Sequence, residues 1–507
     1  MKILVIGAGL GGLGTALRLQ GAGHDVTVLE QLPTPGGRAS QIVDGRYVWD
    51  TGPSLITMPW VLEETFAAGG LNFRDEVDLL PLEPYYRIHW AGDDRHLDVM
   101  TDRDGMRDEL AKFSAHDARA FDGFLDALRP IYEEGILAAG RRSFDTPLSL
   151  AGLLPTMVRL GAALPLHTFV SRHFDHERVR EAMGFHSLFI GGDPFRVPAI
   201  YGALVYLQFL DGVHYTRGGV YSVVEAMARH LDVRTSTRVE RIEHRGGRVR
   251  GVVTDGGELI EADAVVWNGD AAALDGMLGV RRQLRSRRSS MSALLVYLGT
   301  DRQFPQLRHH TLMVGTGYKR FIKDVTSRRR LAANYSTYIH APSRTEPGMA
   351  ADGGDSIAIL LPVPNLRSGD TWDDAQTQAV ADGVIADLEE TFGVEGLAES
   401  TVVRHTMTPA DFRDRYAAVD GNAFALEPTL HQSAAFRVPN RHPKVRGVYA
   451  VGGGSHPGAG VPGVLFGAEV TAGLIAQDHP RPTSFTVPPG ASGTLDQNSS
   501  TKVTTTC

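Results

Sequence analysis

The chain has 507 residues, which is long for a single hydrophobic core and predicts two or more packed units. Its 51 lysines and arginines against 59 aspartates and glutamates give a formal net charge of −8, which argues against a protein that binds nucleic acid through its overall charge. The single cysteine, Cys507, excludes an internal disulfide and a cysteine-rich metal site, and it fits the reducing conditions of the cytoplasm.

The N-terminal segment combines a strand with a glycine cluster. Residues 3–6 are a short apolar run, rich in β-branched side chains, that predicts a buried parallel strand. The run ends in GAGLGG, in which Gly7, Gly9 and Gly12 have the spacing G-x-G-x-x-G. A helical stripe of leucines follows, and a second apolar strand ends in Glu30, near the roughly 20-residue separation expected for a ribose-binding acid. This order of features predicts a dinucleotide site, with the phosphates at the N-terminal end of the helix.

The residues after Glu30 narrow the choice between NAD and FAD. The stretch QLPTPGGRASQ, residues 31–41, carries Gly36 and Gly37 followed by Arg38. It resembles the extended fingerprint of FAD enzymes in the amine oxidase and carotenoid desaturase superfamily. The resemblance implies that the chain passes close to the cofactor at Gly37 and that the Arg38 guanidinium offsets phosphate charge. Taken alone, the same residues also fit a surface turn.

The C-terminal stretch GVYAVGGGSHPGAGVPGVLFGAEVTAGLIA, residues 447–476, supplies the partner of that fingerprint. It predicts a strand, a glycine-dense crossing and a helix of small residues, and it resembles the C-terminal signature of bacterial phytoene desaturases. The resemblance implies that the crossing lies along the ribityl chain and the flavin ring, with these residues as flavin neighbours: Gly454, Ser455, Gly460 and Val461. In the same family the segment TRVERI, residues 237–242, makes a backbone contact to the adenine, which implies that role for Val239.

Similarity to phytoene desaturases spans nearly the whole chain and implies an α/β fold. It implies a Rossmann-like FAD-binding domain, three-layered with a mostly parallel sheet, built from three segments at about residues 1–85, 215–290 and 431–478. The inserted residues are expected to form a substrate and membrane-associating domain with a mixed sheet and helices, at 86–214 and 291–430. Residues 479–507 are rich in Pro, Ser, Thr and Gly and predict a disordered tail.

The resemblance also implies a function. It indicates an FAD-dependent carotenoid desaturase of the phytoene desaturase type, which introduces C=C double bonds into a C40 carotenoid and is reoxidised by an electron acceptor, quinone or oxygen. A late-acting 3,4 or 3′,4′ desaturase of the same family stays open as an alternative, as does a non-catalytic isoprenoid-binding escort protein. An amine oxidase on the same fold would require an aromatic cage beside the flavin, which the sequence does not reveal.

A lipid-soluble substrate predicts a surface that meets the membrane. Residues 148–170 are apolar with one charge, Arg159, but Pro155 and Pro165 argue against a spanning helix. They predict a broken amphipathic segment on the bilayer at the mouth of a tunnel, and a buried pair of core helices is the alternative. Two arginine clusters could contact anionic lipid headgroups: Arg281, Arg282, Arg285, Arg287 and Arg288, and Arg328, Arg329 and Arg330. The expected location is cytoplasmic and peripheral to the membrane.

Catalytic residues are not assigned, because the cation left by hydride loss is allylic and delocalised, which lowers the demand for a strong base. His456 and Asp193 are candidate proton acceptors, although His456 also fits a structural residue beside the cofactor and Asp193 a turn cap before Pro194. His173 and His176 lack a convincing third ligand, so no metal site is predicted.

Overall fold

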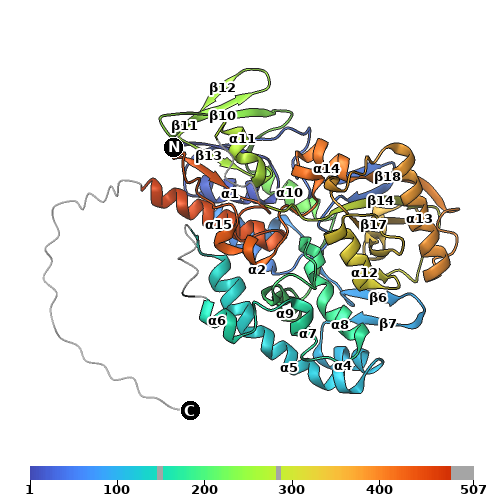
Figure 1. The fold of residues 1–507 in the computed structure, drawn as a ribbon. Coiled ribbons are helices and arrows are strands. Elements are labelled where there is room, and N and C mark those ends of the chain that lie inside the picture. Colours follow the sequence, from blue (N-terminus) through green and yellow to red (C-terminus); the bar gives the residue numbers. More distant parts are fainter. Residues whose placement is uncertain (145–151, 153, 281–286, 481–507) are drawn as a thin grey trace, which may run out of the picture.

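The structure is a computed structural model that describes residues 1–144, 152, 154–280 and 287–480. Two large sheets of different kinds, with helices around them, organise these residues (Figure 1). The first sheet is wholly parallel and the second is mixed, so they follow different rules of burial and pairing.

The parallel sheet brings together the beginning, the middle and the end of the described chain. Its strands, in the order β19, β13, β1, β2 and β9, are Val448–Ala450, Ala264–Trp267, Lys2–Ile6, Asp25–Leu29 and Asp232–Arg234. Ile3, Leu4 and Val5 have no exposed surface, because layers cover both faces of the sheet. This burial explains why the first strand is an uninterrupted apolar run rather than an alternating one.

Alternate residues of β1 contribute to different layers. Ile3 and Val5 belong to the main hydrophobic core, which includes the helices that pack on one face: α1 (Leu10–Gly21), α2 (Pro59–Ala68), α10 (Tyr221–Ala228) and α15 (Val461–Asp478). Leu4 and Ile6 belong to a second core under an antiparallel sheet on the other face, made of β10 (Val239–Arg245), β11 (Arg248–Thr254) and β12 (Leu259–Glu261). Helices, parallel sheet and antiparallel sheet are the three layers of the predicted Rossmann-like domain.

The mixed sheet has seven strands in the order β18, β14, β17, β16, β15, β6 and β7. Their bounds in that order are Thr401–Met407, Ser292–Thr300, Asp355–Val363, Ser336–His340, His310–Val314, Tyr86–Trp90 and Asp93–Val99. Only β15 and β6 pair in parallel, and the longest pairing runs from Ser292 opposite Val363 to Thr300 opposite Asp355. The α/β fold class with a second, mixed sheet is thereby confirmed.

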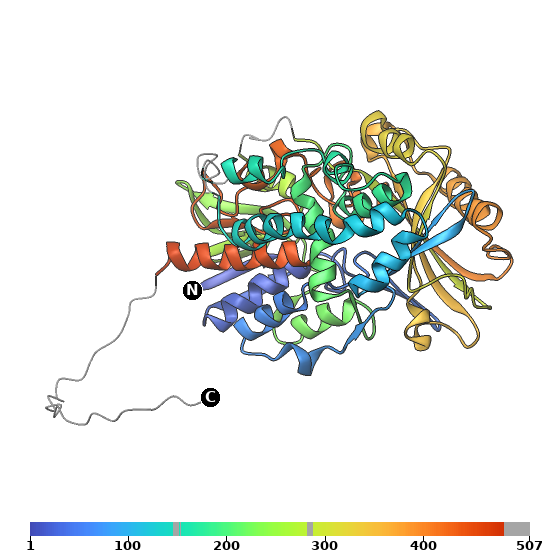
Figure 2. The ribbon, with the colours of Figure 1, turned by 90° about the horizontal axis from the view of Figure 1, so that it is seen from below.

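Helices fill the remaining side of the molecule, beside both sheets (Figures 1 and 2). They are α4 (Arg103–Ala111), α5 (Ala115–Tyr132), α6 (Leu154–Arg159), α7 (Leu166–Val170), α8 (Glu177–Gly184) and α9 (Ala203–Asp211). On the mixed-sheet side lie α12 (Tyr318–Lys323) and α13 (Asp374–Phe392). Shorter elements complete the fold: β3 (Gln41–Asp44), β4 (Tyr47–Asp50), α3 (Phe73–Glu76), β5 (Leu79–Pro81), β8 (His214–Thr216), α11 (Leu274–Met277) and α14 (Pro409–Tyr416).

The apolar stretch 148–170 divides into two unlike halves. Its residues 148–151 and 153 lie outside the described residues, and α6 and α7 are short helices separated by a turn. Val158 of α6 is 68% exposed, whereas Leu166 and Val170 of α7 are fully buried. The α7 half is therefore part of the core, as the buried alternative expects, and only the α6 half presents an apolar side chain to the outside.

Two further expectations concern the membrane and the tail. Among the described residues, every helix is too short or too polar to cross a bilayer. Of the predicted disordered tail, residues 481–507 lie outside the part of the chain that the structure describes.

Candidate active site

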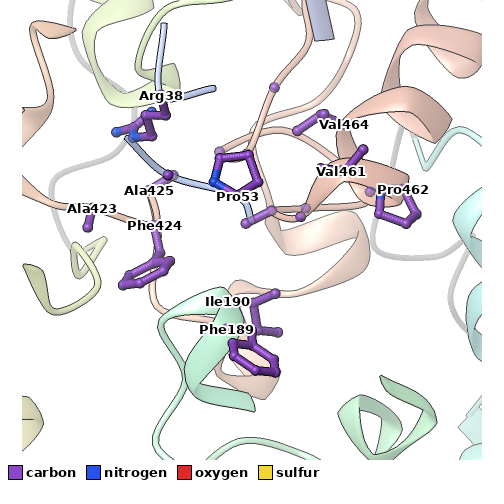
Figure 3. Close-up of a pocket in the computed structure, with 18 of the residues that line it drawn as sticks. Arg38, Pro53, Phe189, Ile190, Ala423, Phe424, Ala425, Val461, Pro462 and Val464 are labelled. Atoms are coloured by element: carbon purple, nitrogen blue, oxygen red, sulfur yellow. The ribbon is translucent and has the colours of Figure 1, made fainter. Parts of the chain in front are cut away.

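A cavity of about 980 Å³ is lined by residues of both large sheets, and Figure 3 shows part of its lining. One wall comes from the carboxyl ends of β1, β2 and β13, the edge at which nucleotides bind to open parallel sheets. The opposite wall comes from the mixed sheet, with Leu295, Leu312, Tyr338 and Leu360. Cofactor and substrate surfaces therefore share one space.

The glycine loop closes the β1 end of this cavity. Gly7 has φ +99°, which favours glycine, and a Cβ on Gly12 would overlap the Gly7 carbonyl oxygen. The helix α1 begins directly after Gly9 without a side-chain cap, so its first backbone N–H groups remain available to an anion. Asn268, at the end of β13, donates from Nδ2 to the Gly7 carbonyl at 3.0 Å and holds the loop in this shape.

The carboxylate of Glu30 is fixed at the end of β2. The residue is 5% exposed, and its Oε2 and Oε1 accept hydrogen bonds from the backbone N–H groups of Ala8 (2.8 Å) and Leu32 (2.9 Å). A carboxylate has about four acceptor positions, so the group retains capacity for hydroxyl donors of a ribose. The same contacts tie the glycine loop to the second strand.

Two arginines place positive charge at this site. Arg38 donates from Nη2 to the carbonyl oxygen (3.2 Å) and Oδ1 (3.3 Å) of Asn422, while Arg437 donates from Nη1 to the carbonyl of Gly453 at 2.7 Å. Burial lowers the pKa of Arg38, against the raising effect of Asp270. The Nε atoms of both arginines are buried and have no protein partner. Unmet donors of this kind fit an anionic or hydrogen-bonding ligand.

The C-terminal crossing approaches the same cavity from the other side. Gly452, Gly458 and Gly460 all have positive φ, and a Cβ on Gly454 would lie 2.6 Å from that of Ala271. The helix α15 begins at Val461 without a side-chain cap, and its first turn lines the cavity (Figure 3). A tight backbone and a second open helix N-terminus therefore face the region that a flavin would occupy.

The structure brings together nine of the eleven residues predicted to bind the cofactor. These residues line the cavity: Gly7, Gly9, Glu30, Gly37, Arg38, Val239, Gly454, Gly460 and Val461. Gly12 and Ser455 lie behind the lining, where Gly12 allows α1 to pack on the loop and Ser455 is fully buried. Both residues therefore contribute to the shape of the backbone. At Gly12 there is no room for a larger residue, because a Cβ would overlap the Gly7 carbonyl oxygen.

Asn268 and Arg437 are site residues that the sequence reasoning did not single out. Asn268 follows directly after β13, and nothing in the sequence around it shows that its amide returns to Gly7. Arg437 is only 3% exposed although it follows a polar loop. Arg437 is a charged residue in a segment that resembles phytoene desaturases, and this could have indicated a role in the site. No motif distinguishes it from its neighbours.

The two candidate proton acceptors have different surroundings. His456 lines the cavity, its Nε2 lies 3.2 Å from the Ala139 carbonyl, and burial lowers its pKa to about 4. Asp193 lies outside the lining, and its carboxylate accepts from the Phe195 backbone N–H (2.9 Å) and the Thr326 hydroxyl (3.0 Å). Asp193 thus acts as a turn cap. His456 is a buried neutral group beside the cofactor region.

Most of the remaining lining of the cavity is apolar. Figure 3 shows Phe189 and Ile190 facing Pro53, with Phe424 beside them. Other apolar side chains extend the wall: Met157, Val158, Phe185, Leu188, Leu204, Leu207, Phe321 and Phe436. A cavity with this lining accommodates a hydrocarbon and keeps water away from it.

Glycine loop, ribose acid, open helix ends and apolar cavity together define a flavin-dependent oxidoreductase. Residues 10–476 match the family described as flavin containing amine oxidoreductase, and the chain belongs to this family. Within it, the chain is 34% identical to the lycopene-forming phytoene desaturase of Pantoea ananas, over 94% of this chain and 99% of that protein. It is 37% identical to the neurosporene-forming phytoene desaturase of Cereibacter sphaeroides, over 95% of each chain. It is 33% identical to the zeta-carotene-forming phytoene desaturase of Myxococcus xanthus, over 96% of each.

Solved structures agree with the fold. An oxidoreductase from Methanosarcina mazei superposes with a TM-score of 0.61 at 16% identity, over 92% of this chain and 99% of that one. Wild-type putrescine oxidase bound to putrescine superposes with a TM-score of 0.63 at 14% identity, over 94% and 99%. The predictions of FAD as cofactor and of an FAD-dependent carotenoid desaturase are confirmed by family and relatives together.

Proposed function

We propose that this FAD-dependent carotenoid desaturase uses phytoene as its substrate and introduces C=C double bonds into it. The observation that carries the proposal is the single cavity of about 980 Å³, in which the glycine loop and a long apolar wall face each other. The relatives named above differ in their products, but all are phytoene desaturases. A late-acting 3,4 or 3′,4′ desaturase is the second candidate.

The cofactor roles follow the position of each group. We assign the pyrophosphate to the loop of Gly7, Gly9 and Gly12 at the open end of α1, and the ribose to Glu30. Gly37 and Arg38 lie in the loop that follows β2 and Glu30. We assign the backbone of Val239 to the adenine. The flavin ring is assigned to the C-terminal crossing, with Gly454, Ser455, Gly460 and Val461.

FAD supplies the acceptor for a hydride when it is bound. The protein chain orients the substrate and excludes water from it. An apolar wall holds a hydrocarbon chain in one path and keeps water from adding to the cation that hydride loss creates. The free backbone N–H groups at the N-terminus of α15 and the guanidinium of Arg437 would stabilise negative charge on the bound cofactor.

The proposed division of the chain places the FAD-binding domain at residues 1–85, 215–290 and 431–478. The substrate domain then comprises 86–214 and 291–430. This division is supported by the strands, because each of the first three segments contributes to the parallel sheet and β6 begins at Tyr86 in the mixed sheet.

We propose a cytoplasmic enzyme that docks on the membrane at the mouth of the cavity. Three cavity-lining side chains are strongly exposed: Val158 (68%), Leu430 (53%) and Phe436 (44%). Exposed apolar side chains at an opening favour contact with lipid, from which a carotenoid enters. Of the arginine clusters, residues 281–286 lie outside the described residues, and Arg328 and Arg330 bind Asp324, so they are less suited to headgroups. A quinone or oxygen is the proposed electron acceptor.

The deciding experiment adds the FAD-loaded protein to liposomes that contain phytoene, lycopene or a hydroxylated C40 carotenoid. Products with two hydrogens fewer, seen by mass and absorption, are expected from phytoene. Conversion of coloured carotenoids alone would select the late-acting desaturase. Binding without any loss of mass would instead support an isoprenoid-binding escort protein.

A further inference from the structure

A polar file of side chains interrupts the apolar wall of the cavity. The hydroxyls of Ser54 and Tyr338 both line the cavity and lie 2.7 Å apart. The Tyr338 hydroxyl also lies 2.7 Å from Nδ1 of His310, which has no exposed surface. The Tyr338 ring meets that of Phe189 at 5.7 Å, so the hydroxyl stands beside the hydrocarbon path.

Behind Tyr338, three histidines form a buried cluster. His310 and His340 face each other across strands β15 and β16, and their rings are stacked at 5.2 Å. Nε2 of His340 lies 3.2 Å from Nε2 of His309, and Nδ1 of His309 lies 2.6 Å from the hydroxyl of Thr345, which is partly exposed. Nε2 of His310 is buried without a hydrogen-bond partner, and each of the three histidines has a ring nitrogen within 4.8 Å of a ring nitrogen of the other two.

This arrangement suits proton transfer by neutral groups. Burial lowers the pKa of His309, His310 and His340, so each ring has one donor and one acceptor nitrogen at neutral pH. Transfer from Nε2 of His310 to the next ring requires a bridging water, because this nitrogen has no hydrogen-bond partner in the protein. The path then leads from the cavity wall to Thr345 near the surface.

Two carboxylates also line the cavity. The carboxylate of Glu181 accepts from the Trp90 indole N–H at 2.8 Å, and that of Asp270 accepts from the amide of Asn422 at 2.9 Å. Tyr338 differs from both because its hydroxyl lies 2.7 Å from a buried imidazole nitrogen, Nδ1 of His310, to which it can pass its own proton as it accepts another.

We propose that Ser54, Tyr338 and His310 form the proton-accepting chain of the desaturation. The inference rests on the proposed function, in which one carbon gives up a hydride to the flavin. The C–H bond on the adjacent carbon then breaks, and its electron pair becomes the second bond of the new C=C. The proton joins the Tyr338 oxygen while the proton of that hydroxyl moves to Nδ1 of His310. The imidazolium of His310 releases its Nε2 proton towards His340, His309 and Thr345 and becomes neutral again, with its remaining proton on Nδ1. The next turnover requires this proton to return to Nε2.

The test compares Tyr338→Phe with the wild type and with Tyr335→Phe. Tyr335 lies three residues away and outside the cavity lining, so it controls for the loss of a tyrosine hydroxyl in this segment. Full-length, FAD-loaded proteins receive phytoene in liposomes, and desaturation is followed by mass. We expect Tyr338→Phe to lower kcat by roughly 10²-fold, with FAD content and KM unchanged, and Tyr335→Phe to lower it less than twofold.

An isotope effect separates proton transfer from a merely structural role. Phytoene with deuterium on the carbon that loses the proton is expected to slow Tyr338→Phe several-fold more than it slows the wild type. His310→Asn, which keeps an acceptor near the Nδ1 position but cannot take up a proton, is expected to show the same signature if Tyr338→Phe does not fold.

Several outcomes would overturn the relay. Variants as fast as an active wild type, or isotope effects equal to that of the wild type, would do so. One equivalent of zinc in the isolated protein, lost in His310→Asn, would also do so, because a metal would occupy the nitrogens that must pass the proton. An inactive wild type would instead refute the proposed function.

Discussion

The two walls of the cavity are built on different principles. The wall on the parallel sheet consists of backbone and glycine, and its hydrogen bonds come from loops next to one another in the fold, as in the contact of Glu30 with Ala8. The wall on the mixed sheet consists of side chains from five strands, and only a few of them are polar. In the proposed assignment, the main chain and a few charged side chains such as Glu30 hold the cofactor, whereas mostly apolar side chains contact the substrate.

The largest expected effect breaks the backbone wall. Gly12→Ala places a Cβ over the Gly7 carbonyl oxygen and 2.9 Å from Nδ2 of Asn268. We expect the FAD content of the purified protein to fall at least about tenfold and the free energy of unfolding to fall by about 1–3 kcal/mol. The measurements are the flavin spectrum and urea denaturation.

Gly123→Ala is the matched control, since nothing lies within 4 Å of a Cβ at this position of α5. It should retain FAD and gain about 0.5–1 kcal/mol of stability, because alanine is the better helix former. Full FAD content in Gly12→Ala would contradict the role given to the glycine loop.

A substitution in the side-chain wall should change carotenoid turnover but not FAD content. Leu360→Glu puts an unpaired carboxylate into the apolar cavity, across from Tyr338 on the next strand. A buried charge without a partner costs several kcal/mol, so the variant is expected to lose at least about tenfold in carotenoid turnover while its FAD content stays normal. Turnover is measured by mass, and FAD by absorbance.

The control for that variant is Val402→Glu on β18, an edge strand of the same sheet, where the side chain is 56% exposed. It should leave both quantities unchanged. If Leu360→Glu lost its FAD, the two walls would not be functionally separable.

A third substitution tests the contact proposed between Glu30 and the ribose of FAD. In Glu30→Gln the amide oxygen can still accept from the Ala8 backbone N–H, but the charge is lost and a donor replaces one acceptor. Hydrogen bonds to charged groups contribute about 1.5–3 kcal/mol, so FAD affinity should fall by roughly 10- to 100-fold. Calorimetric titration of the apoprotein measures it. The exposed Glu225→Gln on α10 serves as control, and an equal affinity for both variants would contradict the assignment of Glu30.

The smallest expected effect is at the rim. Phe436→Asp replaces a side chain that is 44% exposed, and its partial insertion into lipid contributes about 1 kcal/mol. Flotation with anionic vesicles should show a loss of binding of roughly fivefold, while turnover in detergent stays unchanged. Leu259→Asp on β12, at 46% exposure, is the control, and equal flotation of both variants would place the membrane contact elsewhere.

The cofactor wall was predictable because its signals are local. Gly7, Gly9, Glu30 and Gly37 act within short segments, where the spacing of residues fixes which backbone groups come together. Asn268 escaped prediction because it acts on Gly7, 261 residues away in sequence. Arg437 binds Gly453 only 16 residues further on, and it escaped because it belongs to no motif with a defined spacing. The stretch 148–170 was predicted as one segment, but packing buries α7 and leaves Val158 exposed.

By itself, the sequence determined the dinucleotide-binding motif, because that motif depends on residue spacing and apolar periodicity, which a single segment carries. FAD, the family and the second, mixed sheet were implied by the resemblance to phytoene desaturases. Only the tertiary structure decided that Ser54, Tyr338 and His310 are joined by hydrogen bonds and that Val158, Leu430 and Phe436 line the same cavity. The physical reason is that a hydrogen bond or a cavity wall between residues from separate strands depends on how the strands are ordered and registered, and no single stretch of the chain encodes that order.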